Sequence, residues 1–84
     1  MKKIIFSAHA LEQMTERGTS RQEVEKAISV GELIPARRGR ISFRYNFQFN
    51  ARWGNRYYSI KQVAPIVVEE DEGYVVITVY VFYF

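Results

Sequence analysis

The segment ISFRYNFQFNARWGNRYYSIKQV, residues 41–63, decides the fold of this chain. Apolar and polar residues alternate without interruption over its first thirteen positions, which is the pattern of a β-strand with one buried face. Gly54 and Asn55 follow, and a two-residue turn that begins with glycine suits a type II′ hairpin. The segment therefore predicts two antiparallel strands joined by a tight turn.

The turn also predicts the register of the two strands. Pairs are counted inward from Trp53 opposite Arg56, so that Phe47 falls opposite Gln62 on an otherwise apolar face. On the opposite, polar face the same count places Gln48 beside Lys61. The polar face of the hairpin is then expected to carry Arg44, Arg52, Tyr57 and Lys61.

Helical signals precede the hairpin. Residues 2–6 read as a short strand, and Ser7 and Gly18 are a suitable N-cap and stop for a helix over residues 8–17. Ser20 and Glu23 form an S-x-x-E capping box for a second helix, which ends at Gly31. A basic loop over residues 35–40 then leads into the hairpin.

A last strand follows the hairpin. Residues 69–73 form an acidic turn, and YVVITVYVFYF, residues 74–84, is expected to pair with the second strand of the hairpin. Its aliphatic row is expected on the apolar face and the other row on the polar face. The row expected on the polar face consists of Tyr74, Val76, Thr78, Tyr80, Phe82 and Phe84.

These elements predict a single α+β domain over residues 1–84, because so short a chain has no room for a second core. Two N-terminal helices pack on one face of a three- or four-stranded, mainly antiparallel sheet. The opposite face of the sheet stays open to solvent.

Charge is segregated along the chain. Residues 33–68 hold seven basic residues and no acidic one, whereas the rest holds five basic and nine acidic residues. This segregation favours an anionic partner for the middle of the chain, although exposed strands can also simply prefer arginine to aspartate. Because exposed aromatic rings stack on unpaired bases, single-stranded RNA is the expected ligand. The candidate RNA-binding residues are Arg37, Arg38, Arg40, Arg44, Arg52 and Tyr57.

Several classes of protein are disfavoured by the residues themselves. Without cysteine, and with a single histidine, a zinc site is not expected, and the chain has no phosphate-binding loop or dinucleotide motif. No cofactor is therefore expected. No apolar run approaches the roughly 20 residues of a membrane span, and no signal peptide is recognisable, so we expect a cytoplasmic protein with no membrane partner.

His9 is the one imidazole in the chain and lies at the start of the first expected helix. A neutral imidazole could act as a general base. A capping or core role is the alternative for a lone histidine. Arg17 lies two turns further along roughly the same helix face, where it could instead simply complement the helix dipole.

The segments FSAHALEQMTERGTSRQEVEKAISVGELI and VVITVY together resemble a small bacterial domain family of unknown function. That family is marked by an S-x-H-A start, an R-G-[IT]-S turn and a terminal V-x-T-V-Y strand. It is similar to the RelE-like and BrnT-like toxins of toxin–antitoxin pairs, which are metal-independent ribonucleases. The residues matched by position are His9, Arg17, Gly18, Glu23 and Thr78, of which Glu23 is better explained by the capping box.

The resemblance implies a RelE-like fold and an endoribonuclease of the mRNA interferase type, held in check by a cognate antitoxin. Taken together with the acid-free basic strands, it leads to a hypothesis in which His9 or Tyr80 transfers protons, Lys61 stabilises the phosphate together with strand arginines, and Thr78 positions the RNA. The candidate catalytic residues are thus His9, Arg17, Lys61, Thr78 and Tyr80.

Two other functions remain open from the sequence. One is a nucleic-acid-binding module without catalysis, although the mixed charge of the second helix suits a DNA major groove poorly. The other is a protein-interaction module, because the terminal residues VFYF leave apolar bulk that could join a homodimer or an antitoxin.

Overall fold

The computed structural model describes residues 2–84, which form two helices and one five-stranded mixed sheet. The elements are β1 (Lys3–Phe6), α1 (Ala8–Arg17), α2 (Arg21–Val30), β2 (Glu32–Pro35), β3 (Arg40–Trp53), β4 (Arg56–Glu70) and β5 (Gly73–Tyr83). The strands lie in the order β1-β5-β4-β3-β2, and β1 pairs with β5 in parallel while the other pairs are antiparallel. The predicted α+β class is confirmed, but the sheet is larger than expected because the four residues of β2 carry too short a pattern to be recognised.

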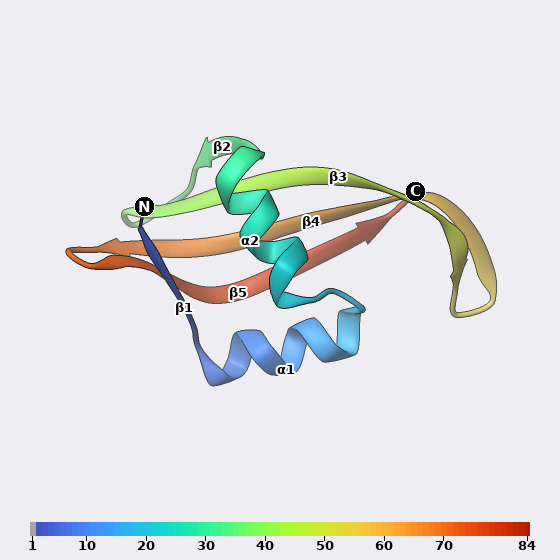
Figure 1. Cartoon of the computed structure of the whole chain (residues 1–84), viewed down its shortest axis with the longest axis horizontal. Coiled ribbons are helices and arrows are strands. Elements are labelled where there is room, and N and C mark those ends of the chain that lie inside the picture. Colours follow the sequence, from blue (N-terminus) through green and yellow to red (C-terminus); the bar gives the residue numbers. More distant parts are fainter. Residues whose placement is uncertain (1) are drawn as a thin grey trace.

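Both helices begin as their caps predict. The Ser7 hydroxyl accepts a hydrogen bond from the backbone N–H of Ala10, and Ser20 accepts one from Glu23. Gly18 ends α1 in the left-handed conformation, with φ of 82°. Figure 1 shows both helices on one face of the sheet, with α2 crossing β3 and β4 and α1 lying alongside β5.

The core lies between these helices and the covered face of the sheet. Ala10 and Met14 of α1 and Val24 and Ala27 of α2 are buried against the strands. The strand residues of this core are Phe43, Val63, Val67, Val76 and Val79. Most of its members are small, so the helices approach the sheet closely.

A β-bulge changes the predicted register of the hairpin. Near the turn the pairs Trp53–Arg56 and Arg52–Tyr57 are as predicted, but the register shifts between Gln48 and Ala51. Asn50 takes a positive φ of 48° at this point. Because a one-residue slip turns every following side chain to the other face, Lys61 pairs with Phe47 and is buried beneath the helices. The prediction that Lys61 lies on the polar face is wrong.

A second irregularity, between Ile66 and Val67, affects β5. Val76 is fully buried in the core and Tyr74 packs against it, so the prediction that these two residues lie on the open face is wrong. Tyr80 and Phe82 are exposed, as predicted.

Side chains of α1 cover the outer edge of β5 beyond the end of β1. The Gln13 side-chain oxygen accepts hydrogen bonds from the Val79 N–H (2.9 Å) and from the Thr78 hydroxyl. The Arg17 guanidinium donates to the Val79 carbonyl (2.6 Å), and the Tyr83 hydroxyl donates to the Arg17 carbonyl (2.6 Å). An unpaired strand edge is prone to join other chains, and α1 closes this one without a further strand.

Gln13→Ala is expected to destabilise the fold by about 1–3 kcal/mol, because the Val79 N–H and the Thr78 hydroxyl both lose their acceptor in a partly buried place. Urea unfolding would measure the change. Gln22→Ala, at an exposed position of α2, is the matched control and should cost far less. Gln13→Glu keeps an acceptor and should recover most of the loss; equal stability of the Gln13→Ala and Gln22→Ala variants would contradict the edge-closing role.

Candidate nucleic-acid interface

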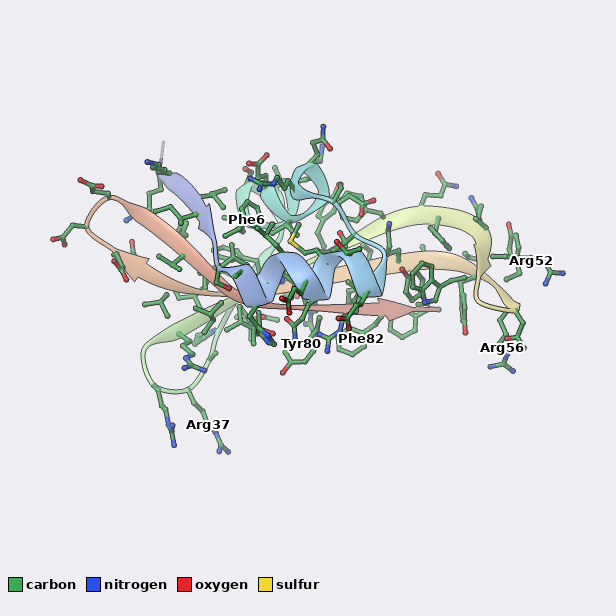
Figure 2. All side chains as sticks on the ribbon, turned by 90° about the horizontal axis from the view of Figure 1, so that it is seen from below. Phe6, Arg37, Arg52, Arg56, Tyr80 and Phe82 are labelled. Carbon is green, nitrogen blue, oxygen red and sulfur yellow. The ribbon has the colours of Figure 1, made fainter. Side chains whose placement is uncertain are left out.

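The face of the sheet opposite the helices, here called the open face, carries two exposed aromatic rings. Tyr80 and Phe82 are 43% and 46% exposed, and their rings are nearly parallel, at 17°, with centroids 6.3 Å apart. Figure 2 shows both side chains projecting from the sheet on the side away from α2. Alternation along β5 produces this arrangement, because Val79 and Val81, the two neighbours of Tyr80 in the strand, point toward the core.

Arg17 joins α1 to this aromatic pair. Its guanidinium carbon lies 5.3 Å from the centre of the Tyr80 ring, within the range of a cation–π contact. The hydrogen bond from Arg17 to the Val79 carbonyl fixes the direction of the side chain. A positive charge is therefore held beside an exposed ring.

His9 lies exposed on α1, one turn before Gln13 and two turns before Arg17. Residues spaced four apart share one side of a helix, so His9 lies on the side of α1 that follows the β5 edge. The helix is capped by Ser7, and the core role considered for His9 is not observed. The imidazole is open to solvent.

Arg44 lies on the open face and is paired with a carboxylate that the sequence prediction did not place there. Its guanidinium lies 3.0 Å from the Glu32 carboxylate, and Glu32 stands opposite Arg44 on β2. Both side chains are largely exposed, so the ion pair contributes at most about 1 kcal/mol and can open to another anion.

The remaining predicted RNA-binding residues lie in two separate places. Arg37 and Arg38 belong to the β2–β3 loop and Arg40 is the first residue of β3; this loop descends on the same side as Tyr80 and Phe82 (Figure 2). Arg52 lies at the far tip of the β3–β4 hairpin, beside the exposed Tyr57 that pairs with it. The structure therefore brings the loop arginines, and not Arg52 and Tyr57, to the open face near the aromatic pair.

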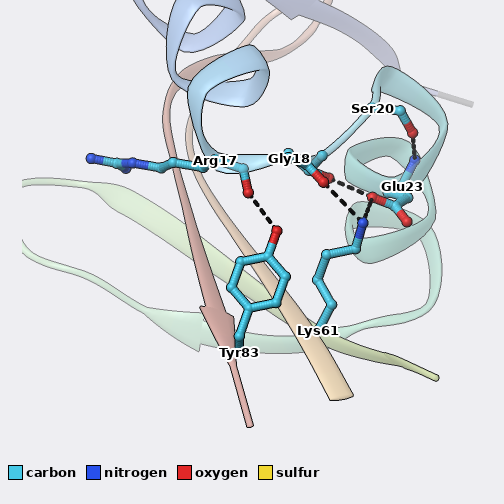
Figure 3. A network of polar contacts seen from close by, with 7 residues as sticks. Arg17, Gly18, Ser20, Glu23, Lys61 and Tyr83 are labelled. Atoms are coloured by element: carbon cyan, nitrogen blue, oxygen red, sulfur yellow. Dashed lines mark hydrogen bonds and ion pairs between the residues drawn. The ribbon is translucent and has the colours of Figure 1, made fainter. Parts of the chain in front are cut away.

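Lys61 belongs to a polar network beneath the helices, which Figure 3 shows. Its ammonium group donates to the Gly18 carbonyl (2.9 Å) and forms an ion pair with Glu23 (2.8 Å). The Thr19 hydroxyl donates to the same Glu23 oxygen. Lys61 thus holds the turn between the helices to the sheet, and we do not place it among the groups that contact RNA.

Thr78 and Tyr83 are also held within the fold. The Thr78 hydroxyl donates to Gln13, so it is engaged in closing the strand edge. Burial raises the pKa of the Tyr83 phenol, and the nearby Glu23 carboxylate raises this pKa further, so the phenol remains a donor to the Arg17 carbonyl at neutral pH.

Phe82 and Gln13 are the residues of this region that the sequence prediction did not single out as site or support residues. The sequence could have indicated Phe82, because strand alternation places it on the same face as Tyr80. No pattern in the sequence indicates the role of Gln13, because that role depends on α1 lying against an edge of β5.

Within residues 2–84, no cluster of three or more histidine or acidic side chains has the arrangement of a metal site. None of the helices described there has the length and apolar character required to cross a membrane.

One family matches nearly the whole chain: residues 6–81 match the family described as Domain of unknown function (DUF4258). The chain belongs to the DUF4258 family. Residues 6–81 run from the end of β1 almost to the end of β5, so the matched region includes both helices and Tyr80, and it ends one residue before Phe82. No curated protein and no solved structure matches the chain. Membership of a family of unknown function agrees with the expected resemblance, while the relation to RelE-like toxins stays a prediction.

Proposed function

We propose that this protein binds single-stranded RNA on the open face of its sheet and cleaves it there as a metal-independent endoribonuclease. The observation that carries the proposal is the exposed, mutually parallel pair of rings on β5, with the Arg17 guanidinium beside Tyr80. Aromatic rings left in water on a strand offer stacking surfaces for bases, worth about 1–3 kcal/mol per base. Bases within a duplex are already stacked, so a single strand is the form that gains this contact.

Positive charge supports the same ligand. Arg17 lies beside Tyr80, Arg44 is on the open face, and the β2–β3 loop with Arg37 lies on the same side of the sheet (Figure 2). Arginine guanidiniums pair well with phosphate oxygens. Glu32 partly neutralises Arg44, but a weak surface ion pair yields readily to a polyanion.

The proposed reaction is attack of a ribose 2′-oxygen on the adjacent phosphorus, with breakage of the bond to the 5′-oxygen. The products are a 2′,3′-cyclic phosphate and a 5′-hydroxyl end. His9 and Tyr80 are the groups suited to take the proton from the 2′-hydroxyl and to give one to the leaving 5′-oxygen. Arg17, whose guanidinium lies beside the Tyr80 ring, would stabilise charge on the phosphate. As in a toxin–antitoxin pair, a cognate antitoxin would restrain this activity.

The binding half of the proposal is tested with a labelled single-stranded RNA by fluorescence anisotropy. Tyr80→Ala and Phe82→Ala should each weaken binding about 5- to 150-fold, which is the loss of one stacked base. Tyr57→Ala removes a more exposed ring, 60% exposed, from the far hairpin and is the matched control. Equal affinity of all variants, or equal affinity for duplex RNA, would contradict binding on the open face.

The catalytic half is tested separately, by cleavage in excess EDTA and by growth after induction. Tyr80→Phe keeps the ring and removes the hydroxyl, and His9→Asn removes the imidazole at an exposed position, so neither change should disturb the fold. At least one should abolish cleavage while RNA affinity is retained. Binding without any cleavage by the wild-type protein would leave a binding module as the function.

A protein-interaction function is favoured by one specific observation, the outer edge of β3. Strand β2 pairs with residues 41–44 of β3, and the following YNFQF segment, residues 45–49, has no strand on its outer side within the described sheet. This segment has no charge or proline to discourage pairing. A partner strand, from an antitoxin or a second copy, could add here. Slowed amide exchange confined to residues 45–49 on complex formation would support that function.

A further inference from the structure

The β2–β3 loop has a backbone conformation that does not suit its residues. Arg38 and Gly39 have positive φ values of 61° and 72°, and the Arg40 N–H donates to the Arg37 carbonyl at 3.3 Å. Two consecutive positive φ values are the geometry of a type I′ turn, whose first central position favours asparagine, aspartate or glycine. An arginine there carries backbone strain.

The hairpin turn requires a positive φ at position 38, but it does not require an arginine there. Where β3 needs a positive φ at its bulge, the residue is Asn50, which tolerates that conformation. A Cβ added at Gly39 would meet no atom within 4 Å, so the loop tip stands in open space rather than being forced by packing. Strain kept without a packing reason points to a function for the side chain.

A hollow lies beneath this loop. It has a volume of about 350 Å³ and is lined by Ala36, Arg37, Arg38, Arg40 and Ile66. None of its three arginines forms an ion pair within residues 2–84. The loop hangs on the side of the sheet from which Tyr80 and Phe82 project (Figure 2), so the hollow opens at one end of the proposed RNA path.

We propose that this hollow binds a phosphomonoester, the terminal phosphate of the RNA strand that lies on the open face. This inference rests on the proposed function. An internal phosphodiester carries a single negative charge, whereas a terminal monoester carries about −1.5 to −2 at neutral pH. The hollow is lined by three arginines and by no carboxylate, so it suits the doubly charged monoester better than the singly charged phosphodiester. Binding of the phosphorylated end in the hollow thereby determines which nucleotide of the strand reaches Tyr80.

The test compares the affinity of one short RNA bearing a 5′-phosphate, a 3′-phosphate or neither. One of the two terminal phosphates should tighten binding by about tenfold or more. Arg37→Gln/Arg38→Gln should abolish this gain, so that the phosphorylated and unphosphorylated strands bind with equal affinity. Arg52→Gln/Arg56→Gln, which removes the same charge from the tip of the β3–β4 hairpin, should leave the gain intact. No gain from either phosphate, or equal loss in both double variants, overturns the proposal.

A second variant separates binding from folding. Arg38→Asn places a favoured residue at the strained position, so its midpoint of thermal unfolding should equal or exceed that of the wild type. The same variant should lose a large part of the gain from the terminal phosphate. A full gain in Arg38→Asn would show that the strained side chain has no part in binding and would overturn the assignment of Arg38.

Failure of the proposed function is distinguished with AMP, a monoester that needs no stacking of a strand. If the protein binds no RNA, saturable binding of AMP that is lost in Arg37→Gln/Arg38→Gln still supports the hollow as a phosphomonoester site for a free nucleotide. Failure to bind both AMP and a phosphorylated strand overturns the site. Binding of RNA without an end effect leaves the proposed function standing and overturns this inference alone.

Discussion

Lys61→Ala is expected to destabilise the fold by about 2–4 kcal/mol and to leave RNA affinity unchanged in the protein that remains folded. The Lys61 side chain is 9% exposed, and its ammonium group links the Gly18 carbonyl to Glu23. Removing one partner of a buried ion pair typically costs about 3–5 kcal/mol. The Glu23 side chain is 26% exposed and also accepts a hydrogen bond from the Thr19 hydroxyl, so we expect a smaller loss of stability. Urea unfolding measures the change.

Two further variants make this result specific. Lys26→Ala removes the same charge from an exposed position of α2 and should cost little. Lys61→Met/Glu23→Gln leaves neither charge unpaired and should be more stable than Lys61→Ala. If Lys61→Ala were as stable as Lys26→Ala and cleaved no RNA, a catalytic role for Lys61 would be restored.

Gly18→Ala is expected to have the second large effect, a loss of stability of about 2–5 kcal/mol. Two penalties add at this position. The φ of 82° is unfavourable for alanine by about 1–2 kcal/mol. A Cβ would also lie 2.6 Å from the Trp53 ring and 2.7 Å from the Tyr83 hydroxyl, and such overpacking costs about 1–3 kcal/mol.

Gly39→Ala separates these two penalties. Gly39 has a φ of 72°, but a Cβ there would meet no atom within 4 Å. This control therefore carries the backbone penalty alone. Thermal unfolding of both variants gives the packing penalty as the difference. Equal destabilisation would mean that the Trp53 ring moves freely and does not fix the turn between the helices.

The turn chemistry predicted the hairpin well close to the turn and poorly beyond it. Trp53–Arg56 and Arg52–Tyr57 pair as expected because Gly54 and Asn55 fix the register locally. Beyond the bulge, β4 is apolar at every position from Val63 to Val68, so its own pattern could not show which side faces the helices. One extra residue in β3 was enough to bury Lys61.

The candidate site was predictable where it depends on local pattern. Alternation in β5 placed Tyr80 on the open face, and helical spacing placed His9 and Arg17 on one side of α1. The uses of Thr78 and Gln13 were not predictable, since their hydrogen bonds join segments more than 60 residues apart. Such contacts follow from tertiary packing, which cannot be deduced from the alternation or helical spacing of residues in the sequence.

The position of β5 has a consequence for how the protein is made. It is the last of the described strands to be synthesised, yet it lies between β1 and β4. Before it emerges from the ribosome, β1 has no strand to join and the Gln13 side chain has no edge to close. The aromatic pair is also absent until then, since Tyr80 and Phe82 belong to that strand. A nascent chain that still lacks residues 73–83 therefore has neither a complete sheet nor an RNA-binding face, so the proposed activity begins only after these residues have been added.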